Sequence, residues 1–254
     1  MTEVVQVHLV CGGVFHDFDF ARLEILKLLS EWDRVRTTVG QDYSDVTALS
    51  RSDVLVTYTC NVAPTAEQIQ ALRTFIERGG RWFALHATNA VTEWLSGPGE
   101  EPRVDTPDLP APFIDMLGSQ FKAHPPLGER FWVRASEPVH PLAEGIGPFL
   151  ADDELYLSSY RSGNIPILET RWKGDVPYFT EGSWPEESAH LVMYLRPTDL
   201  GGVLYLTLGH CRGHYDFRPV YLYYPKVERC SWDLPVFYHL LRLGLGWAID
   251  RTDR

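Results

Sequence analysis

Apolar stretches alternate with amphipathic stretches along the first ninety residues of the chain. Residues 4–10, 35–39 and 53–58 are short apolar or β-branched runs, which predict strands. Residues 20–32 and 65–76 place apolar side chains at helical spacing, which predicts two amphipathic helices. Successive strand-to-helix units of this kind predict a parallel sheet with right-handed crossovers.

The stretch from Gly79 to Ala90 has the sequence GGRWFALHATNA. Its apolar run, Trp82 to Leu85, predicts a buried parallel strand that turns sharply into a helix, with His86 at the turn. Ligands of open α/β sheets bind in the crevice beyond the carboxyl ends of the strands. His86 is therefore the first candidate functional residue, although a backbone carbonyl could equally satisfy a histidine in a turn.

The second half of the chain is less regular, but it shows no internal repeat. Residues 97–112 hold five prolines and several acids, which predicts a surface insertion or lid. Residues 172–189 are rich in Gly, Pro, Trp and acids, which predicts a loop that faces the cleft. Two strand-like runs between residues 190 and 208 precede a closing amphipathic helix at 235–249. We therefore expect one domain over residues 1–254.

Composition and charge narrow the class of protein. The 254 residues carry a formal net charge of −11, which argues against nucleic acid as a partner because no basic patch could release counterions. No apolar run reaches the length of about eighteen residues that a membrane span needs, and the amino terminus lacks a secretory signal. Four scattered cysteines form no CxxC pair, so neither a disulfide framework nor a zinc ribbon is predicted. A reduced, cytoplasmic protein is the simplest interpretation.

Several short motifs follow one another along the chain. They are His16-Asp17 after the first strand, GGRWFALHATNA, LGSQFKAHP, His140-Pro141 followed by DDELY, and LTLGH before a final helix that ends in GWAID. In this order they resemble the ThuA-like (trehalose-utilisation) family over nearly the whole chain. The resemblance implies a flavodoxin-like fold, similar to that of the class I glutamine amidotransferases, with a mostly parallel sheet and helices on both faces. It also implies a carbohydrate or keto-sugar derivative as the substrate.

The chain departs from the amidotransferase relatives at the turn after the strand that ends at Leu85. Where those relatives carry a nucleophilic cysteine, this chain carries His86. An imidazole does not replace a thiolate that attacks a carbonyl, so glutamine hydrolysis through a thioester is not expected. No nucleotide cofactor is expected either. If the protein is an enzyme, we expect a hydrolase, lyase or isomerase rather than an amidotransferase.

Five histidines fall at predicted loops or strand ends: His16, His86, His124, His210 and His214. Such imidazoles can bind a divalent metal such as zinc or manganese through neutral nitrogens. Alternatively, His86 and His210 act as general acid or base, with a carboxylate from Asp17, Asp153 or Glu154. Simpler explanations stand beside these, because Asp17 could cap a helix and the other two acids could lie at a solvated strand edge.

Aromatic side chains concentrate in the predicted loops of the second half. Tyr156, Trp184 and Tyr215, together with Asp153, are the candidates for substrate binding, because flat aromatic faces beside acids suit sugars and aromatic rings alike. We therefore favour an enzyme with a small-molecule substrate, and keep two alternatives: a ligand-binding sensor without catalysis, and an enzyme of aromatic-compound catabolism. A pure binding pocket needs few titratable side chains, which distinguishes the sensor from the enzymes. The aromatic loops are compatible with a homo-oligomer.

Overall fold

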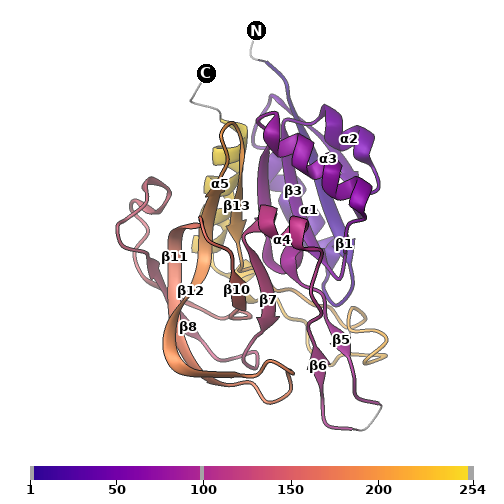
Figure 1. Cartoon of the computed structure of the whole chain (residues 1–254), viewed down its shortest axis with the longest axis vertical. Coiled ribbons are helices and arrows are strands. Elements are labelled where there is room, and N and C mark those ends of the chain that lie inside the picture. The colour runs from indigo at the N-terminus through magenta and orange to yellow at the C-terminus, as the bar shows by residue number, and fades with distance from the viewer. Residues whose placement is uncertain (1–2, 98–99, 251–254) are drawn as a thin grey trace.

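A nine-stranded mixed sheet forms the centre of the protein (Figure 1). The computed structural model describes residues 3–97 and 100–250. The two ends of the expected domain 1–254, and residues 98 and 99 of the expected insertion 97–112, lie outside this part. The strand order is β2-β1-β3-β4-β13-β12-β11-β8-β9.

The first five strands of this order run parallel to one another. They are β2 (Val35–Gly40), β1 (Val5–Gly13), β3 (Val54–Cys60), β4 (Arg81–Leu85) and β13 (Gly202–Leu206). Every residue of β3 and β13 is buried, since these strands are covered on both faces. This explains why they form continuous apolar runs in the sequence instead of alternating ones.

Four antiparallel strands extend the sheet beyond β13. They are β12 (Ser183–Pro197), β11 (Ile165–Asp175), β8 (Phe131–Ala135) and β9 (Phe149–Ala151). The predicted α/β, flavodoxin-like fold is confirmed, and the sheet is mixed because these four antiparallel strands continue the parallel half.

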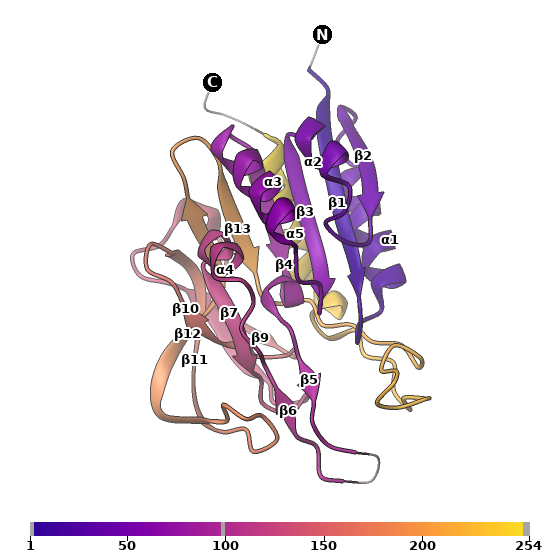
Figure 2. The ribbon, with the colours of Figure 1, turned by 45° about the vertical axis from the view of Figure 1, so that its right-hand side comes forward.

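Helices cover both faces of the parallel half (Figure 2). One face carries α1 (Phe18–Leu29) and α5 (Pro235–Ile249), and the other carries α2 (Val46–Arg51), α3 (Ala66–Glu77) and α4 (Ala111–Leu117). Their apolar sides belong to two separate clusters of buried residues, one on each face of the sheet. The parallel strands are thus fixed from both sides, and their carboxyl ends form a rigid edge.

Short elements surround that edge. A hairpin of β5 (Glu93–Trp94) and β6 (Val104–Asp105) projects from the body, and β7 (Ser119–Ala123) pairs with β10 (Leu157–Tyr160) (Figure 1). Single 3-10 turns lie at His86–Asn89, Pro141–Ala143 and Cys230–Asp233. The described part of the expected insertion contains β6 and the start of α4.

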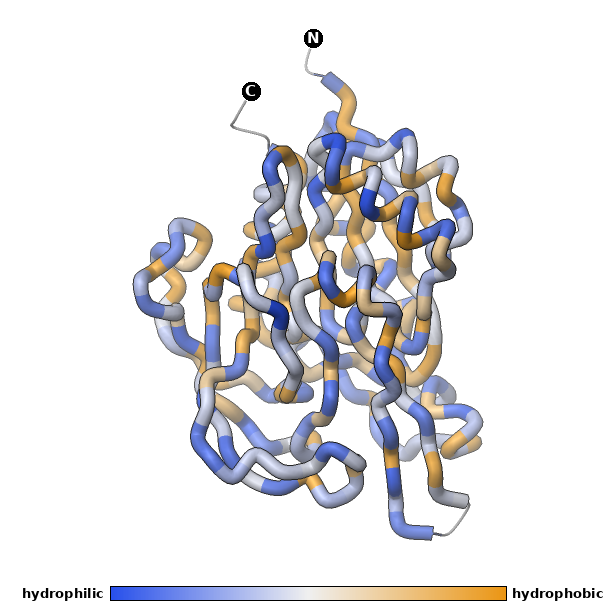
Figure 3. The backbone as a smooth tube through the Cα atoms, viewed as in Figure 1, coloured by the Kyte–Doolittle hydropathy of each residue, from blue (hydrophilic) through white to orange (hydrophobic). Residues whose placement is uncertain are grey.

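Two sequence predictions about local structure are wrong. The chain does not enter a full helix after His86, because the four-residue 3-10 turn leads directly into an extended segment. Residues 172–189 are not a loop but mostly the arms of the long β11–β12 hairpin. The turn of this hairpin is drawn mostly in the pale and blue colours of polar residues in Figure 3. The outer parts of these strands are mostly polar and alternate exposed with half-buried positions, so they lack the apolar alternation by which strands are predicted. Val176 and Phe179 of the turn are nevertheless buried, which agrees with the expectation that this segment faces the cleft.

Within residues 3–97 and 100–250, no helix is both long and apolar enough to cross a membrane. All four cysteines are free thiols, and three of them are buried.

Candidate active site

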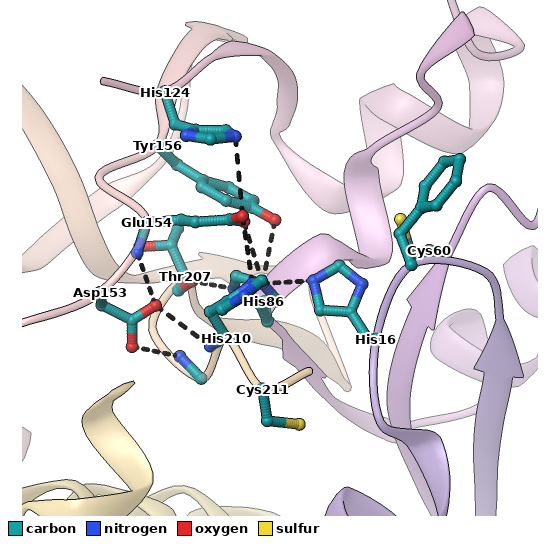
Figure 4. Close-up of polar contacts among 12 residues, drawn as sticks. His16, Cys60, His86, His124, Asp153, Glu154, Tyr156, Thr207, His210 and Cys211 are labelled. Atoms are coloured by element: carbon teal, nitrogen blue, oxygen red, sulfur yellow. Dashed lines mark hydrogen bonds and ion pairs between the residues drawn. The ribbon is translucent and has the colours of Figure 1, made fainter. Parts of the chain in front are cut away.

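Three histidines meet at the carboxyl edge of the parallel strands. His16 follows β1, His86 follows β4 and His210 follows β13, and none of the three side chains is more than 5% exposed. Glu154 joins them from the loop between β9 and β10 (Figure 4). The site is built in this way because parallel strands bring their carboxyl ends to one side of the sheet.

His86 occupies a strained turn directly after β4. Its φ is +45°, a left-handed conformation that residues other than glycine seldom adopt. The Tyr205 hydroxyl donates to the His86 carbonyl oxygen at 2.6 Å and accepts from the Asn89 amide at 3.0 Å. The His86 Nδ1–H donates to the Thr207 carbonyl oxygen at 2.8 Å. This bond fixes the tautomer, and the lone pair of Nε2 therefore faces His16.

Four donor atoms converge in the cluster formed by His16, His86, Glu154 and His210, all within 4.8 Å of one another. The Nε2 atoms of His16 and His86 are 2.9 Å apart, and His86 Nε2 is 3.4 Å from Glu154 Oε2. His210 Nδ1 is 3.1 Å from Glu154 Oε1. Ligands of a tetrahedral zinc ion, with bonds of about 2.0–2.1 Å, lie roughly 3.3 Å apart. The spacing of the cluster therefore fits a divalent cation.

The hydrogen bonds of the cluster support the same fit. The His16 Nδ1 lies 3.4 Å from the Val14 carbonyl oxygen, so His16 and His86 both turn one ring N–H toward the backbone and point their other nitrogens at each other. The buried Nδ1 of His210 has no hydrogen-bond partner in the described chain, although the Glu154 carboxylate touches it. Lone pairs that face each other, on rings that backbone carbonyls orient, are typical of metal ligands. Three imidazoles and one carboxylate are also a donor set suited to zinc or manganese.

Burial and neighbouring charges set the protonation of the cluster. Burial lowers the pKa of His16 well below its ordinary value, and the charges of His86 and His210 lower it further. Burial also opposes a charge on His210, but the Glu154 carboxylate raises the pKa of His210 above its ordinary value. Burial alone would raise the pKa of Glu154, yet His210 holds it well below its usual range. The cluster therefore combines a neutral imidazole with an ionised carboxylate.

Asp153 organises the backbone behind the cluster. Its Oδ1 accepts the amides of Glu154 at 2.8 Å and His210 at 3.0 Å, and its Oδ2 accepts those of Gly209 at 2.9 Å and Ser231 at 3.3 Å. The side chain is 2% exposed. All four bonds come from backbone amides of three separate segments, which this carboxylate ties together. Figure 4 shows Asp153 beside Glu154 and His210. Asp153 therefore positions the site, in place of the substrate-binding role expected from the sequence.

A cavity of about 320 Å³ opens onto the cluster. Pockets for small molecules span roughly 300–1,000 Å³, so its size suits a small ligand. His16, Glu154 and Tyr156 line it on the side of the cluster. Aromatic rings line the remaining walls, among them Phe15, Trp94, Phe121, Tyr178, Phe217 and Tyr224.

The structure places His124 and Tyr156 beside the cluster. The Tyr156 hydroxyl is 3.3 Å from His86 Nε2, and His124 Nε2 is 3.6 Å from Glu154 Oε1. Burial lowers the pKa of His124, which keeps this imidazole neutral. Both residues line the cavity. His124 and Tyr156 are therefore the two further sequence candidates that the structure places at the site, in addition to the four residues of the cluster.

Two other candidates have different partners. The Nδ1–H of His214 donates to the Tyr224 carbonyl oxygen, and the imidazole stacks on Tyr223, so His214 does not join the cluster as a metal ligand. Asp17 caps α1 through the Phe20 amide and pairs with Arg229 at 3.0 Å. It thus fulfils the simpler alternative of a helix cap, because its carboxylate is already occupied by these partners.

The remaining aromatic candidates also lie away from the cavity. Trp184 packs against Trp172 in the β11–β12 hairpin. Tyr215 is 61% exposed and stacks with Arg218. Neither ring belongs to the cavity wall formed by the described residues, which corrects the expectation that they bind substrate.

Arg212 and Glu228 are residues of the cavity wall that the sequence did not single out. Glu228 Oε2 receives Arg212 Nη1 at 3.1 Å and His210 Nε2 at 3.0 Å. The Arg212 guanidinium lies 4.2 Å from the centroid of the Phe217 ring. A signal for Arg212 existed, since it stands two residues after His210, whereas Glu228 belongs to no motif.

Comparison with known proteins identifies a family and a fold. The family model described as "ThuA: Trehalose utilisation" matches residues 13–221. A ThuA-like protein from Bacteroides uniformis ATCC 8492 is 16% identical, with a TM-score of 0.65 over 99% of this chain and 94% of its own. A ThuA-like protein from Parabacteroides merdae ATCC 43184 is 15% identical, with a TM-score of 0.61 over 99% and 93%.

A third structural relative is the cold-adapted β-galactosidase from Rahnella sp. R3. It is 13% identical, with a TM-score of 0.52 over 82% of this chain and 29% of its own. At such low identities, the similarity of these structures is evidence of a shared fold only and carries no information about activity. No curated protein matches the chain.

Proposed function

Since this chain belongs to the ThuA family, we propose that it is an enzyme that acts on a carbohydrate or keto-sugar derivative. The observation that carries this proposal is the buried cluster of three histidines and Glu154 beside a cavity lined by aromatic rings. A pocket that only binds a ligand needs few titratable groups, and this one has at least six in its wall: His16, His124, Glu154, Arg212, Lys226 and Glu228. Their density favours catalysis over sensing.

The proposal includes a divalent cation, zinc or manganese, held by His16, His86, Glu154 and His210. Such an ion, when bound, polarises a substrate oxygen and lowers the pKa of bound water. The protein's own contribution is to hold the four donor atoms. The carbonyl oxygen of Thr207 sets the tautomer of His86, and Asp153 fixes the backbone of both Glu154 and His210.

The residues beside the cluster suit proton transfer and substrate orientation. The neutral His124, which lines the cavity 3.6 Å from Glu154, is placed to accept a proton from a bound substrate. The Tyr156 hydroxyl lines the same wall and can donate a hydrogen bond to a substrate oxygen. General acid–base catalysis is used by hydrolases, lyases and isomerases, so these three classes remain the candidates.

The test measures metal content and turnover in the full-length protein. We expect stoichiometric zinc or manganese in the wild type, loss of that metal in His86→Ala and His210→Ala, and its retention in His239→Ala, a control at an exposed position of α5. Turnover in a panel of sugars and keto-sugars should disappear with the metal. Equal metal content in all four proteins would refute the metal site. A wild type that turns over no member of the panel would refute the enzyme assignment.

A further inference from the structure

The Arg212 guanidinium has donor capacity that the protein does not use. Arg212 is 7% exposed, and its side chain lines the cavity. The Nε atom donates to the Phe15 carbonyl oxygen, and Nη1 donates to Glu228. The Nη2 atom forms no hydrogen bond with the described residues, and Glu154 Oε1 is 4.0 Å from it. A guanidinium this deeply buried normally has its donors paired, so the open side of Arg212 indicates a missing partner.

Lys226 supplies a second cation at the same wall. It lines this cavity and also an adjoining cavity of about 560 Å³, and so lies at the boundary between the two. Lys226 has no ion-pair partner within 4 Å among residues 3–97 and 100–250. The other two arginines of the adjoining cavity are already paired, Arg130 with Asp152 and Arg229 with Asp17.

Two carboxylates and two basic side chains line this wall, and most of their contacts are with one another. Glu228 is shared by His210, Arg212 and the Tyr224 hydroxyl, which donates to its Oε1 at 2.8 Å. Glu154 belongs to the histidine cluster. The donors of this wall that make no hydrogen bond with the described residues are therefore Arg212 Nη2 and the ammonium of Lys226, an exposed residue. Free donors on two cationic side chains suit a negatively charged group of a ligand.

We propose that the substrate carries a carboxylate, which Arg212 Nη2 and the Lys226 ammonium bind while the rest of the molecule reaches the histidine cluster. The substrate is then a sugar acid or an oxidised sugar acid. This inference rests on the proposed function, since it names the substrate class of the same cavity. The planar fork of Arg212, held over Phe217, suits the planar carboxylate.

The charge of the group is limited by the neighbouring acids. Glu154 Oε1 lies 4.0 Å from Arg212 Nη2, and Glu228 already occupies Nη1. A phosphate, with nearly two negative charges, would meet stronger repulsion from these two carboxylates than a single carboxylate does. A monoanion therefore fits this wall better than a phosphate.

The test compares ligands that differ only at one carbon. D-Glucuronate, D-glucose and glucose 6-phosphate, and the matching galacturonate and galactose pair, are titrated calorimetrically into the full-length protein. We expect at least one uronate to bind at least about tenfold more tightly than its neutral twin, because a charge-assisted hydrogen bond is worth that much. Arg212→Gln and Lys226→Gln should each remove most of this preference, whereas Lys173→Gln, an exposed lysine on β11, should keep it.

The outcomes separate this inference from the proposed function. Equal binding of uronate and hexose, tighter binding of the phosphate, or no uronate binding up to the solubility limit would each overturn it. The comparison of ligands in the wild type does not depend on the folding of any variant. Since calorimetry requires no turnover, the carboxylate preference can be found in a protein that fails the metal and activity test, and the converse also holds.

Discussion

Replacement of Asp153 by asparagine tests whether one buried carboxylate holds the site together. The carboxylate accepts four backbone amides, two on each oxygen. In Asp153→Asn one oxygen becomes an NH2 group, so two amide donors, either those of Glu154 and His210 or those of Gly209 and Ser231, face another donor. The substitution changes no volume and makes no cavity.

The size of the effect follows from the number of lost acceptors. Each buried donor without an acceptor costs about 1–3 kcal/mol, so two of them cost roughly 2–6 kcal/mol of unfolding free energy. This is a large part of the stability of an ordinary domain, about 5–15 kcal/mol. The matched control is Asp152→Asn, because Asp152 forms only a half-exposed ion pair with Arg130 at 3.2 Å. Such a pair contributes less than about 1 kcal/mol.

Urea unfolding at neutral pH, followed by circular dichroism, measures both variants. Hydrogen exchange adds a local measurement, since in Asp153→Asn the amide protons of one pair, Glu154 with His210 or Gly209 with Ser231, should lose protection. The reasoning is refuted if Asp153→Asn lies within about 1 kcal/mol of Asp152→Asn, below the smallest cost of two unpaired donors. It is equally refuted if those amides exchange as slowly as in the wild type.

Two further predictions concern single buried groups. Tyr205→Phe removes the hydroxyl that joins the His86 carbonyl to the Asn89 amide, and should cost about 1–3 kcal/mol in urea unfolding. Tyr43→Phe, whose hydroxyl has no hydrogen-bond partner in the described chain, should cost less, and equal losses would contradict the role of Tyr205. Burial lowers the pKa of His8 in the folded state, so its contribution to stability is present above the unfolded value, about 6.5, and is lost as the pH falls through the folded value. His8→Gln should therefore lose less stability than the wild type between neutral and mildly acidic pH, with the exposed His239→Gln as the control; identical losses in all three proteins would contradict this assignment.

The residues that the sequence located are those that follow apolar runs. His86 was found because the run from Trp82 to Leu85 predicts a buried strand. The residue after a buried parallel strand lies at the carboxyl edge of the sheet, so its position could be predicted without knowledge of distant contacts. His16 and His210 follow from the same rule at two other strands. Glu154 needed the family resemblance, because the polar segment around it carries no periodic signal.

Other parts of the site depend on contacts that the sequence does not contain. Arg212 and Glu228 meet because the chain returns on itself, with mutual backbone hydrogen bonds between these two residues. Whether Asp17 serves as a cap or as a catalytic acid depends on where Arg229 lies, more than two hundred residues further on. Trp184 shows a different kind of error. Its Gly- and Pro-rich surroundings suggested a loop, whereas in the structure Trp184 lies on β12 of the long hairpin.

The position of β13 in the sheet also determines when the site can form during folding. β13 lies beside β4, yet it is the last strand along the chain, and Thr207 directly follows it. Until a growing chain has extended past residue 210, the β4 edge has no parallel neighbour on that side, and the His86 imidazole lacks the carbonyl that orients it. Such distant pairings close slowly compared with local ones. The candidate metal ligands thus become a unit only in a nearly finished fold, and a nascent chain offers no assembled site that could capture a wrong ion.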